Sequence, residues 1–208
     1  ISNFRLNNSN LKIETTNSVD NIGGIAGAAT SCSLSNIKVE QVPLSGRDFI
    51  GGIVGKLESG TFSVKTILRC LYSGNIMGRN YLGGIFGYIN QGVASFSLLC
   101  SFGNITATGN YIGGLSGFEL GTYENCYSRM NINGQQHVGG LIGRLTSGQI
   151  IKSYSSGTVT GTSNVGGMVG SKNTATATNS YWDTETSGQA TSALGTPLTS
   201  DQMKCLGG

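Results

Sequence analysis

The stretch Tyr81-Leu82-Gly83-Gly84-Ile85-Phe86-Gly87 recurs with small changes, giving six copies in a chain of 208 residues. A pair of adjacent glycines marks the centre of every copy. The six pairs are Gly23-Gly24, Gly51-Gly52, Gly83-Gly84, Gly113-Gly114, Gly139-Gly140 and Gly166-Gly167. One repeat therefore spans about 26–32 residues, a period typical of proteins built from stacked repeats. We expect one repetitive architecture along most of the chain.

Each repeat divides into three short strands. The glycine-pair phrase is the first, a second glycine four or five residues later (Gly92, for example) marks a turn, and a third segment begins at a cysteine or serine. Parallel strands lie about 4.8 Å apart, so equivalent apolar residues of successive repeats should form buried seams. The predicted seams are Ile50, Leu82, Ile112, Val138 and Val165; Ile53, Ile85, Leu115, Leu141 and Met168; and Ile76, Ile105, Ile132 and Val159.

This pattern predicts an all-β fold, a parallel β-solenoid. We expect a three-sided, right-handed β-helix of six to seven coils, each of about 26–32 residues. Residues 1–20 lack a glycine pair and are expected to form a degenerate N-terminal coil or cap. Residues 21–182 carry the repeats, and residues 183–208 are expected to form a capping segment or tail.

The spacing inside the repeats separates a constant side from a variable one. Counted from Cys70, Cys100, Cys126 and Ser153, the next glycine pair always begins at the same offset. The offset from each glycine pair to the next of these four residues varies instead: it is longest before Cys70 and shortest before Cys126. Insertions in a stack must bulge outwards, so we expect the variable side, around residues 61–69 and 93–99, to be a candidate binding face.

Composition excludes several classes of function. The chain has 34 glycines, 2 prolines and 11% charged residues, with a net charge of only +3. Its densest basic stretch, Lys56 to Arg79, is interrupted by apolar residues, so we expect a solvated face and no nucleic-acid binding. No apolar run reaches the roughly 18 residues of a membrane span. The first residue is Ile1, so we expect a processed chain or a piece of a longer one.

The cysteines recur with the repeats. Cys32, Cys70, Cys100 and Cys126 are predicted to form one column of small inward-facing side chains, continued by serines. Neighbours in such a column are close enough for a disulfide in an oxidising compartment, and this alternative stays open. Cys205 lies outside the column and leaves an odd count. Without a CxxC pair, and with a single histidine, no metal site and no cofactor are expected.

A second column lies directly before the first apolar residue of the seam in each glycine-pair phrase. It contains Phe49, Tyr81, Tyr111 and His137. We interpret His137 as one rung of an aromatic stack rather than as a catalytic base. The alternative is a ligand platform, because rings exposed in a row on a flat face can stack on sugars.

No catalytic residues are predicted. Glycoside hydrolysis usually needs two placed carboxylates, and between Gly60 and Trp182 the only acids are Glu119 and Glu124. Neither HExxH nor GxSxG occurs. We expect that the protein is not an enzyme. Two sequons make Asn7 and Asn104 candidate N-glycosylation sites.

The phrase Gly139-Gly140-Leu141-Ile142-Gly143 and its relatives resemble the GLUG repeat, and residues 179–188 resemble the segment that ends many arrays of it. The resemblance implies a secreted or cell-surface architecture, as in bacterial adhesin-like proteins and the non-catalytic region of IgA-cleaving metallopeptidases. We expect a non-enzymatic adhesive or structural scaffold whose partners are surface glycans or proteins. One alternative is a filament or stalk subunit that assembles end to end with other chains. Another is a carbohydrate-binding or carbohydrate-active β-helix.

Overall fold

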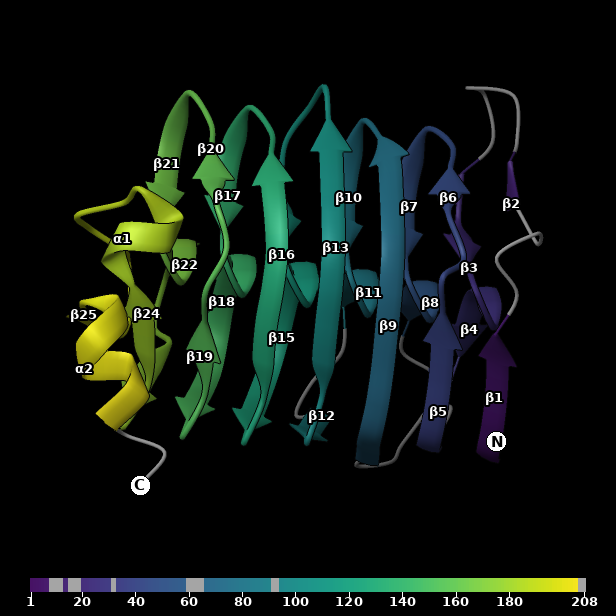
Figure 1. The fold of residues 1–208 in the computed structure, drawn as a ribbon. Coiled ribbons are helices and arrows are strands. Elements are labelled where there is room, and N and C mark those ends of the chain that lie inside the picture. The colour runs from purple at the N-terminus through teal and green to yellow at the C-terminus, as the bar shows by residue number, and fades with distance from the viewer. Residues whose placement is uncertain (8–12, 15–19, 31–32, 59–65, 91–93, 206–208) are drawn as a thin grey trace.

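The computed structural model describes residues 1–7, 13–14, 20–30, 33–58, 66–90, 94–205. They form one right-handed stack of parallel strands, which confirms the predicted all-β parallel solenoid. In Figure 1 the front strands run upwards, the chain returns behind them, and each turn lies to the left of the previous one.

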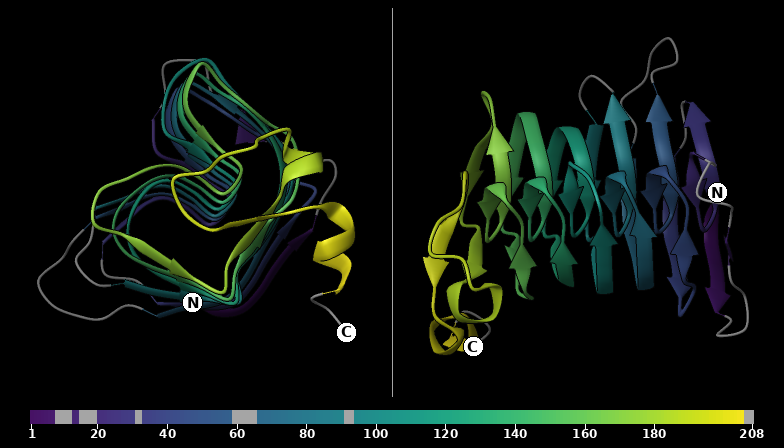
Figure 2. Two further views of the ribbon diagram at one scale, coloured as in Figure 1. Left: turned by 90° about the vertical axis from the view of Figure 1, so that its left-hand side faces the viewer. Right: turned by 90° about the horizontal axis from the view of Figure 1, so that it is seen from above.

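Three walls surround the interior (Figure 2). The glycine-pair wall contains the six-stranded sheet of β3 (Ile22–Gly23), β7 (Asp48–Gly51), β10 (Asn80–Gly83), β14 (Ile112–Gly113), β17 (Gln136–Gly139) and β21 (Ser163–Gly166). After each pair the same wall continues through β4 (Ala26–Thr30), β8 (Val54–Glu58), β11 (Phe86–Asn90), the start of β15 (Ser116–Glu124), the start of β18 (Ile142–Ile151) and β22 (Val169–Lys172). A short wall follows, formed by the start of β9 (Thr66–Gly78), whose remainder continues into the next wall, by β12 (Ala94–Ser97), the ends of β15 and β18, and β23 (Thr176–Thr178).

The third wall is the tall one at the front of Figure 1. It contains β1 (Ser2–Asn7), β2 (Ile13–Glu14), β5 (Leu34–Glu40), β6 (Leu44–Ser45), β9 (Thr66–Gly78), β13 (Cys100–Ala107), β16 (Tyr127–Asn133), β19 (Tyr154–Ser155), β20 (Val159–Thr160), β24 (Tyr181–Asp183) and β25 (Thr196–Leu198). The helices α1 (Thr184–Ser187) and α2 (Ser200–Cys205) follow β24 and β25, respectively.

The stack is slightly shorter than expected. It makes about five turns, against the six to seven coils predicted. The difference lies at the two ends, where the chain adds only parts of a turn. β1 and β2 pair with β5 and β6 before the first full turn, and β25 pairs with β24 after the last one.

The predicted seams are in register and buried, except that Val165 in the last turn is only partly buried. Leu82 pairs with Ile50 and Ile112, and Ile105 pairs with Ile76 and Ile132. All of these side chains are at most 2% exposed. Burial of such a side chain contributes about 2 kcal/mol relative to water, so stability comes from the stack rather than from single coils.

The glycine pair forms an inward corner. In Figure 2 the first wall is drawn towards the opposite tall wall at this point. A Cβ atom on Gly52 would lie 2.2 Å from Cγ of Tyr72, and one on Gly84 would lie 2.6 Å from Cβ of Ser101. At the last turn a Cβ on Gly167 would lie 2.0 Å from Cδ1 of Trp182. Only glycine fits the second position of the pair, because the side chains of the tall wall and the carbonyl oxygen of the next turn's glycine pair occupy the space.

Two corners of each turn hold non-glycine residues with positive φ. One of these corners is the first residue of each glycine-pair phrase, for example Tyr81, where φ is 58°. The other begins the tall wall, at Arg69, Leu98, Asn125, Lys152 and Asn179, with φ between 47° and 57°. Asparagine tolerates this conformation well, whereas most other side chains do not. The ladders of neighbouring turns therefore impose it.

Candidate functional site

The four predicted aromatic rings form a single stack. Ring centroids of Phe49 and Tyr81 are 4.9 Å apart, and those of Tyr81 and Tyr111, and of Tyr111 and His137, are 4.8 Å apart. The interplanar angles are only 6° to 9°. Each ring therefore covers the face of the next.

A second row of side chains packs against this stack from the strand after the inward corner. Tyr88 meets the rings of Phe49 and Tyr81 edge to face at 5.5 and 5.2 Å, and Phe118 meets Tyr111 at 5.9 Å. The ammonium of Lys56 lies 5.1 Å from the centroid of Phe49. The two rows form an aromatic furrow along the outside of the inward corner.

His137 ends this stack. Its Nδ1 lies 2.7 Å from Oγ of Ser171. Burial, with a smaller contribution from nearby Arg144, lowers the pKa of His137. The ring is therefore neutral at physiological pH and acts as a packing group.

The furrow does not have the geometry of a sugar platform. Phe49, Tyr81, Tyr111 and His137 are half-buried, and the faces that would stack on a sugar are covered by neighbouring rings. The expected flat row of exposed faces is replaced by a row of ring edges.

The predicted cysteine column is interrupted. Cys70 and Cys126 are buried at equivalent positions, but Cys100 pairs with Leu71 and Tyr127, one residue further along the strand. Leu99 takes the inward position of that turn. The turn after β13 contains one additional residue, which restores the constant offset to the next glycine pair.

No disulfide joins the described cysteines to one another. The Cys126 thiol donates to the carbonyl of Glu124 at 3.3 Å, and burial raises its pKa to about 12. Burial also raises the pKa of Cys100. Cys205 is exposed in α2, and Cys32 lies outside the described residues.

The variable side and one sequon also fall partly outside the described residues. Of the predicted insertion side, residues 61–65 and 93 lie outside the described ranges, whereas residues 66–69 begin β9 and residues 94–97 form β12. Residues 8–12, which follow Asn7 at the end of β1, also lie outside the described ranges. Asn104 is exposed in β13. Its Nδ2 donates to Oδ1 of Asn75 at 2.9 Å, and a glycan on this nitrogen would disturb that ladder.

The acids near the middle and the end of the chain serve the structure. Glu119 is fully buried, accepts from the Ser116 hydroxyl at 3.4 Å, and burial raises its pKa well above the usual value. Asp183 accepts from the backbone of Glu185 and Thr186 and from Oγ of Ser200 at 2.7 Å. Burial opposes ionisation of Asp183, but these bonds outweigh it and lower its pKa.

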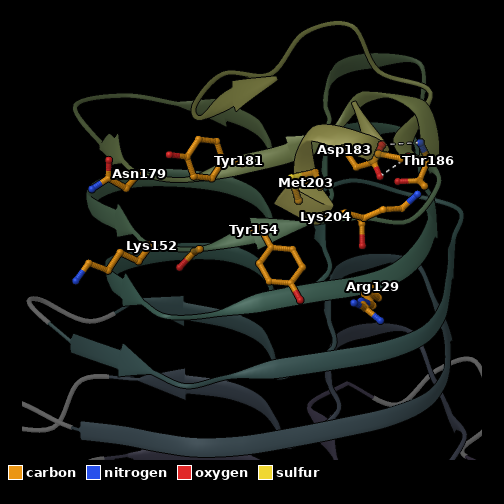
Figure 3. Close-up of a pocket in the computed structure, with 12 residues that line it drawn as sticks. Arg129, Lys152, Tyr154, Asn179, Tyr181, Asp183, Thr186, Met203 and Lys204 are labelled. Carbon is orange, nitrogen blue, oxygen red and sulfur yellow. Dashed lines mark hydrogen bonds between the residues drawn. The ribbon is translucent and has the colours of Figure 1, made fainter. Parts of the chain in front are cut away.

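One pocket of the described structure lies at the C-terminal end, where α2 overhangs the tall wall (Figure 3). Its volume is about 720 Å³. Tyr154 and Tyr181 line it together with the basic residues Arg129, Lys152 and Lys204. The predicted sites did not include this pocket. The sequence contained one indication of this pocket, a tyrosine that recurs at the same place in three successive repeats, as Tyr127, Tyr154 and Tyr181. The position of α2 could not be predicted from that pattern.

The described residues contain no helix long and apolar enough to cross a membrane. Within the same ranges, no group of three or more histidine, cysteine or acidic residues could hold a metal ion.

The fold and its recurring side chains define a β-solenoid repeat module. Residues 134–160 match the family model described as the GLUG motif. This segment holds the turn from β17 to β20, including one glycine pair. No curated protein and no solved structure matches the chain.

Proposed function

We propose that the chain is a non-enzymatic module of a secreted or cell-surface protein, where it serves as an adhesive and structural scaffold. The observation that carries this proposal is the unbroken parallel register of the glycine-pair sheet from β3 to β21. Each turn adds the same rise and the same buried seams, so the module can hold a surface site at a fixed distance. The GLUG motif at residues 134–160 supports the proposal, since the resemblance implies surface proteins.

The roles of the acids support a non-enzymatic function. Glu119 is fully buried inside the stack, where burial raises its pKa, and the Asp183 carboxylate caps α1 and anchors α2. Glu119 does not reach solvent, and the Asp183 carboxylate, which lines the pocket under α2, is already bound by Ser200 and by the backbone of α1.

The end-to-end filament finds less support, because the C-terminal end of the stack is covered. The N–H of Gly167 donates to the carbonyl of Thr191, and the N–H of Val169 donates to Oγ of Ser192 at 2.8 Å. These bonds satisfy strand edges that a second chain would need.

Location and adhesion are tested separately. An antibody against the folded chain should label intact source cells or their culture medium, and protease treatment of intact cells should remove the cell-bound label. Labelling only after lysis would contradict the surface location.

Beads coated with the chain should be retained on a panel of immobilised glycans and surface proteins, whereas beads coated with heat-unfolded chain should not. Equal retention of both would contradict the adhesive role.

A further inference from the structure

We propose that the pocket between α2 and the tall wall binds the carboxylated sugar ring of an acidic oligosaccharide. This inference rests on the proposed adhesive function and gives it a site and a ligand class. The pocket is about 720 Å³, a size suited to a small ligand.

The first argument is an open aromatic face. Tyr154 stacks on Tyr127 with centroids 5.1 Å apart and an interplanar angle of 3°. Tyr181 is the register partner of Tyr154 in the next turn, yet among the described residues it makes no ring contact with Tyr154. Figure 3 shows the two rings displaced sideways from one another. The stack is therefore interrupted inside the pocket, whereas in the aromatic furrow it continues.

The second argument is charge. Arg129 and Lys152 line the pocket from β16 and from the corner before β19, and they lie on either side of Tyr154 in Figure 3. Neither has an ion-pair partner within the described ranges, whereas Arg79 is paired with Asp48. Asp183 also lines the pocket, but its carboxylate is bound by Ser200 and by the backbone of α1. Two cations without an ion-pair partner beside the Tyr154 ring therefore favour a ligand that combines a ring with an anionic group.

The third argument is the polar, fixed roof of the pocket. Ser200 at the start of α2 donates to Asp183, which holds the helix over the wall. Thr186, Ser156 and Asn179 add hydroxyl and amide groups to the lining. Such groups suit the many hydroxyls of a sugar, and the Tyr154 face suits the C–H groups of its ring.

Isothermal titration calorimetry of the full chain tests the inference. The probes are an oligogalacturonate and sialyllactose, which share a carboxylated ring but differ in source, with lactose as the neutral control. Binding of either acidic probe, and weaker binding of lactose, is expected. The preferred acidic probe then identifies the source.

Three variants locate the site. Arg129→Gln and Lys152→Gln should each weaken binding about tenfold, and Tyr154→Leu should weaken it about fivefold. Arg69→Gln is the matched control, because Arg69 occupies the same corner as Lys152 in an earlier turn and is exposed; it should leave binding unchanged. Circular dichroism checks that each variant is folded.

The inference is overturned if neither acidic probe binds, if lactose binds as tightly, if inorganic phosphate competes fully, or if Arg69→Gln weakens binding as much as Lys152→Gln. None of these results bears on cell-surface labelling. Beads that are retained on other ligands while both acidic probes fail would overturn this site and leave the proposed function intact.

Discussion

Replacing Gly84 with alanine tests the inward corner. The new Cβ would lie 2.3 Å from the carbonyl oxygen of Gly114 and 2.6 Å from Cβ of Ser101. Ordinary van der Waals contact begins at 3.4 Å, so the corner must retreat by about 1 Å. Two ladder bonds of 2.9 Å, from Gly84 to Gly114 and from Ile85 to Leu115, would then be lost or weakened.

The expected cost follows from these contacts. Overpacking typically costs about 1–3 kcal/mol, and each lost ladder bond costs about 1 kcal/mol. We therefore expect Gly84→Ala to lower the free energy of unfolding by about 3–5 kcal/mol, measured by urea denaturation with circular dichroism. Gly188→Ala is the control, since its Cβ would meet nothing within 4 Å and its φ of 66° alone should cost about 1 kcal/mol.

A double-mutant cycle separates direct contact from general sensitivity. Ser101→Gly removes one of the two clashing partners, so it should relieve part of the Gly84→Ala cost and give a coupling energy of about 1 kcal/mol or more. Strict additivity of the two substitutions, or a cost of Gly84→Ala no larger than that of Gly188→Ala, would refute the inward corner.

Three further outcomes are expected from urea unfolding. Glu119→Leu should raise the free energy of unfolding at neutral pH by about 1–3 kcal/mol. The reason is that an apolar side chain replaces a buried acid whose Oε1 has no hydrogen-bond partner among the described residues. A lower free energy of unfolding would contradict this. The pKa of Glu119 is higher in the folded protein than its usual value of 4.5, so protonated Glu119 contributes its full stability below pH 4.5. As the pH rises from there towards the folded pKa, the free energy of unfolding should fall by about 1.4 kcal/mol per pH unit. Glu119→Gln should remove this slope, and an unchanged slope would show that other groups cause it. At Tyr81, where φ is 58°, substitution by glycine should cost about 1 kcal/mol less than substitution by alanine, the reverse of the usual order in strands; equal costs would show that the corner relaxes.

The sequence was sufficient for the parts of the fold that repeat. Regular glycine pairs and aliphatic seams specify a parallel stack, because each residue contacts its equivalent in the next turn. The direction of the glycine corner was not predictable, since a glycine pair permits a sharp turn without indicating which side faces inwards. The contacts of Gly52 with Tyr72 become visible only when the opposite wall is placed.

The error at Cys100 had a signal in the sequence. Cys70 and Cys126 precede the buried Ile76 and Ile132 by the same offset, but Cys100 lies one position closer to Ile105. Distance to the aliphatic seam therefore indicates strand register better than distance to the glycine pair, because an additional residue in the intervening turn compensates for the shift.

The candidate site was less predictable than the fold. Recurrence suggested the aromatic stack, but it does not indicate that neighbouring rings cover one another's faces. The pocket needs α2 placed over Tyr154, and the tail that supplies α2 does not repeat. A contact that occurs only once in the chain produces no repeating pattern in the sequence from which it could be predicted.

A distance across the stack tests the central claim, that the described chain is one continuous parallel solenoid. Asn36 and Asn179 are exposed corner residues of the same column, five turns apart. Spin labels at these positions, introduced as Asn36→Cys and Asn179→Cys in a chain whose own cysteines are serines, should give one narrow distance of about 24 Å between backbones. A broad distribution, or a distance well beyond this value, would contradict the stack.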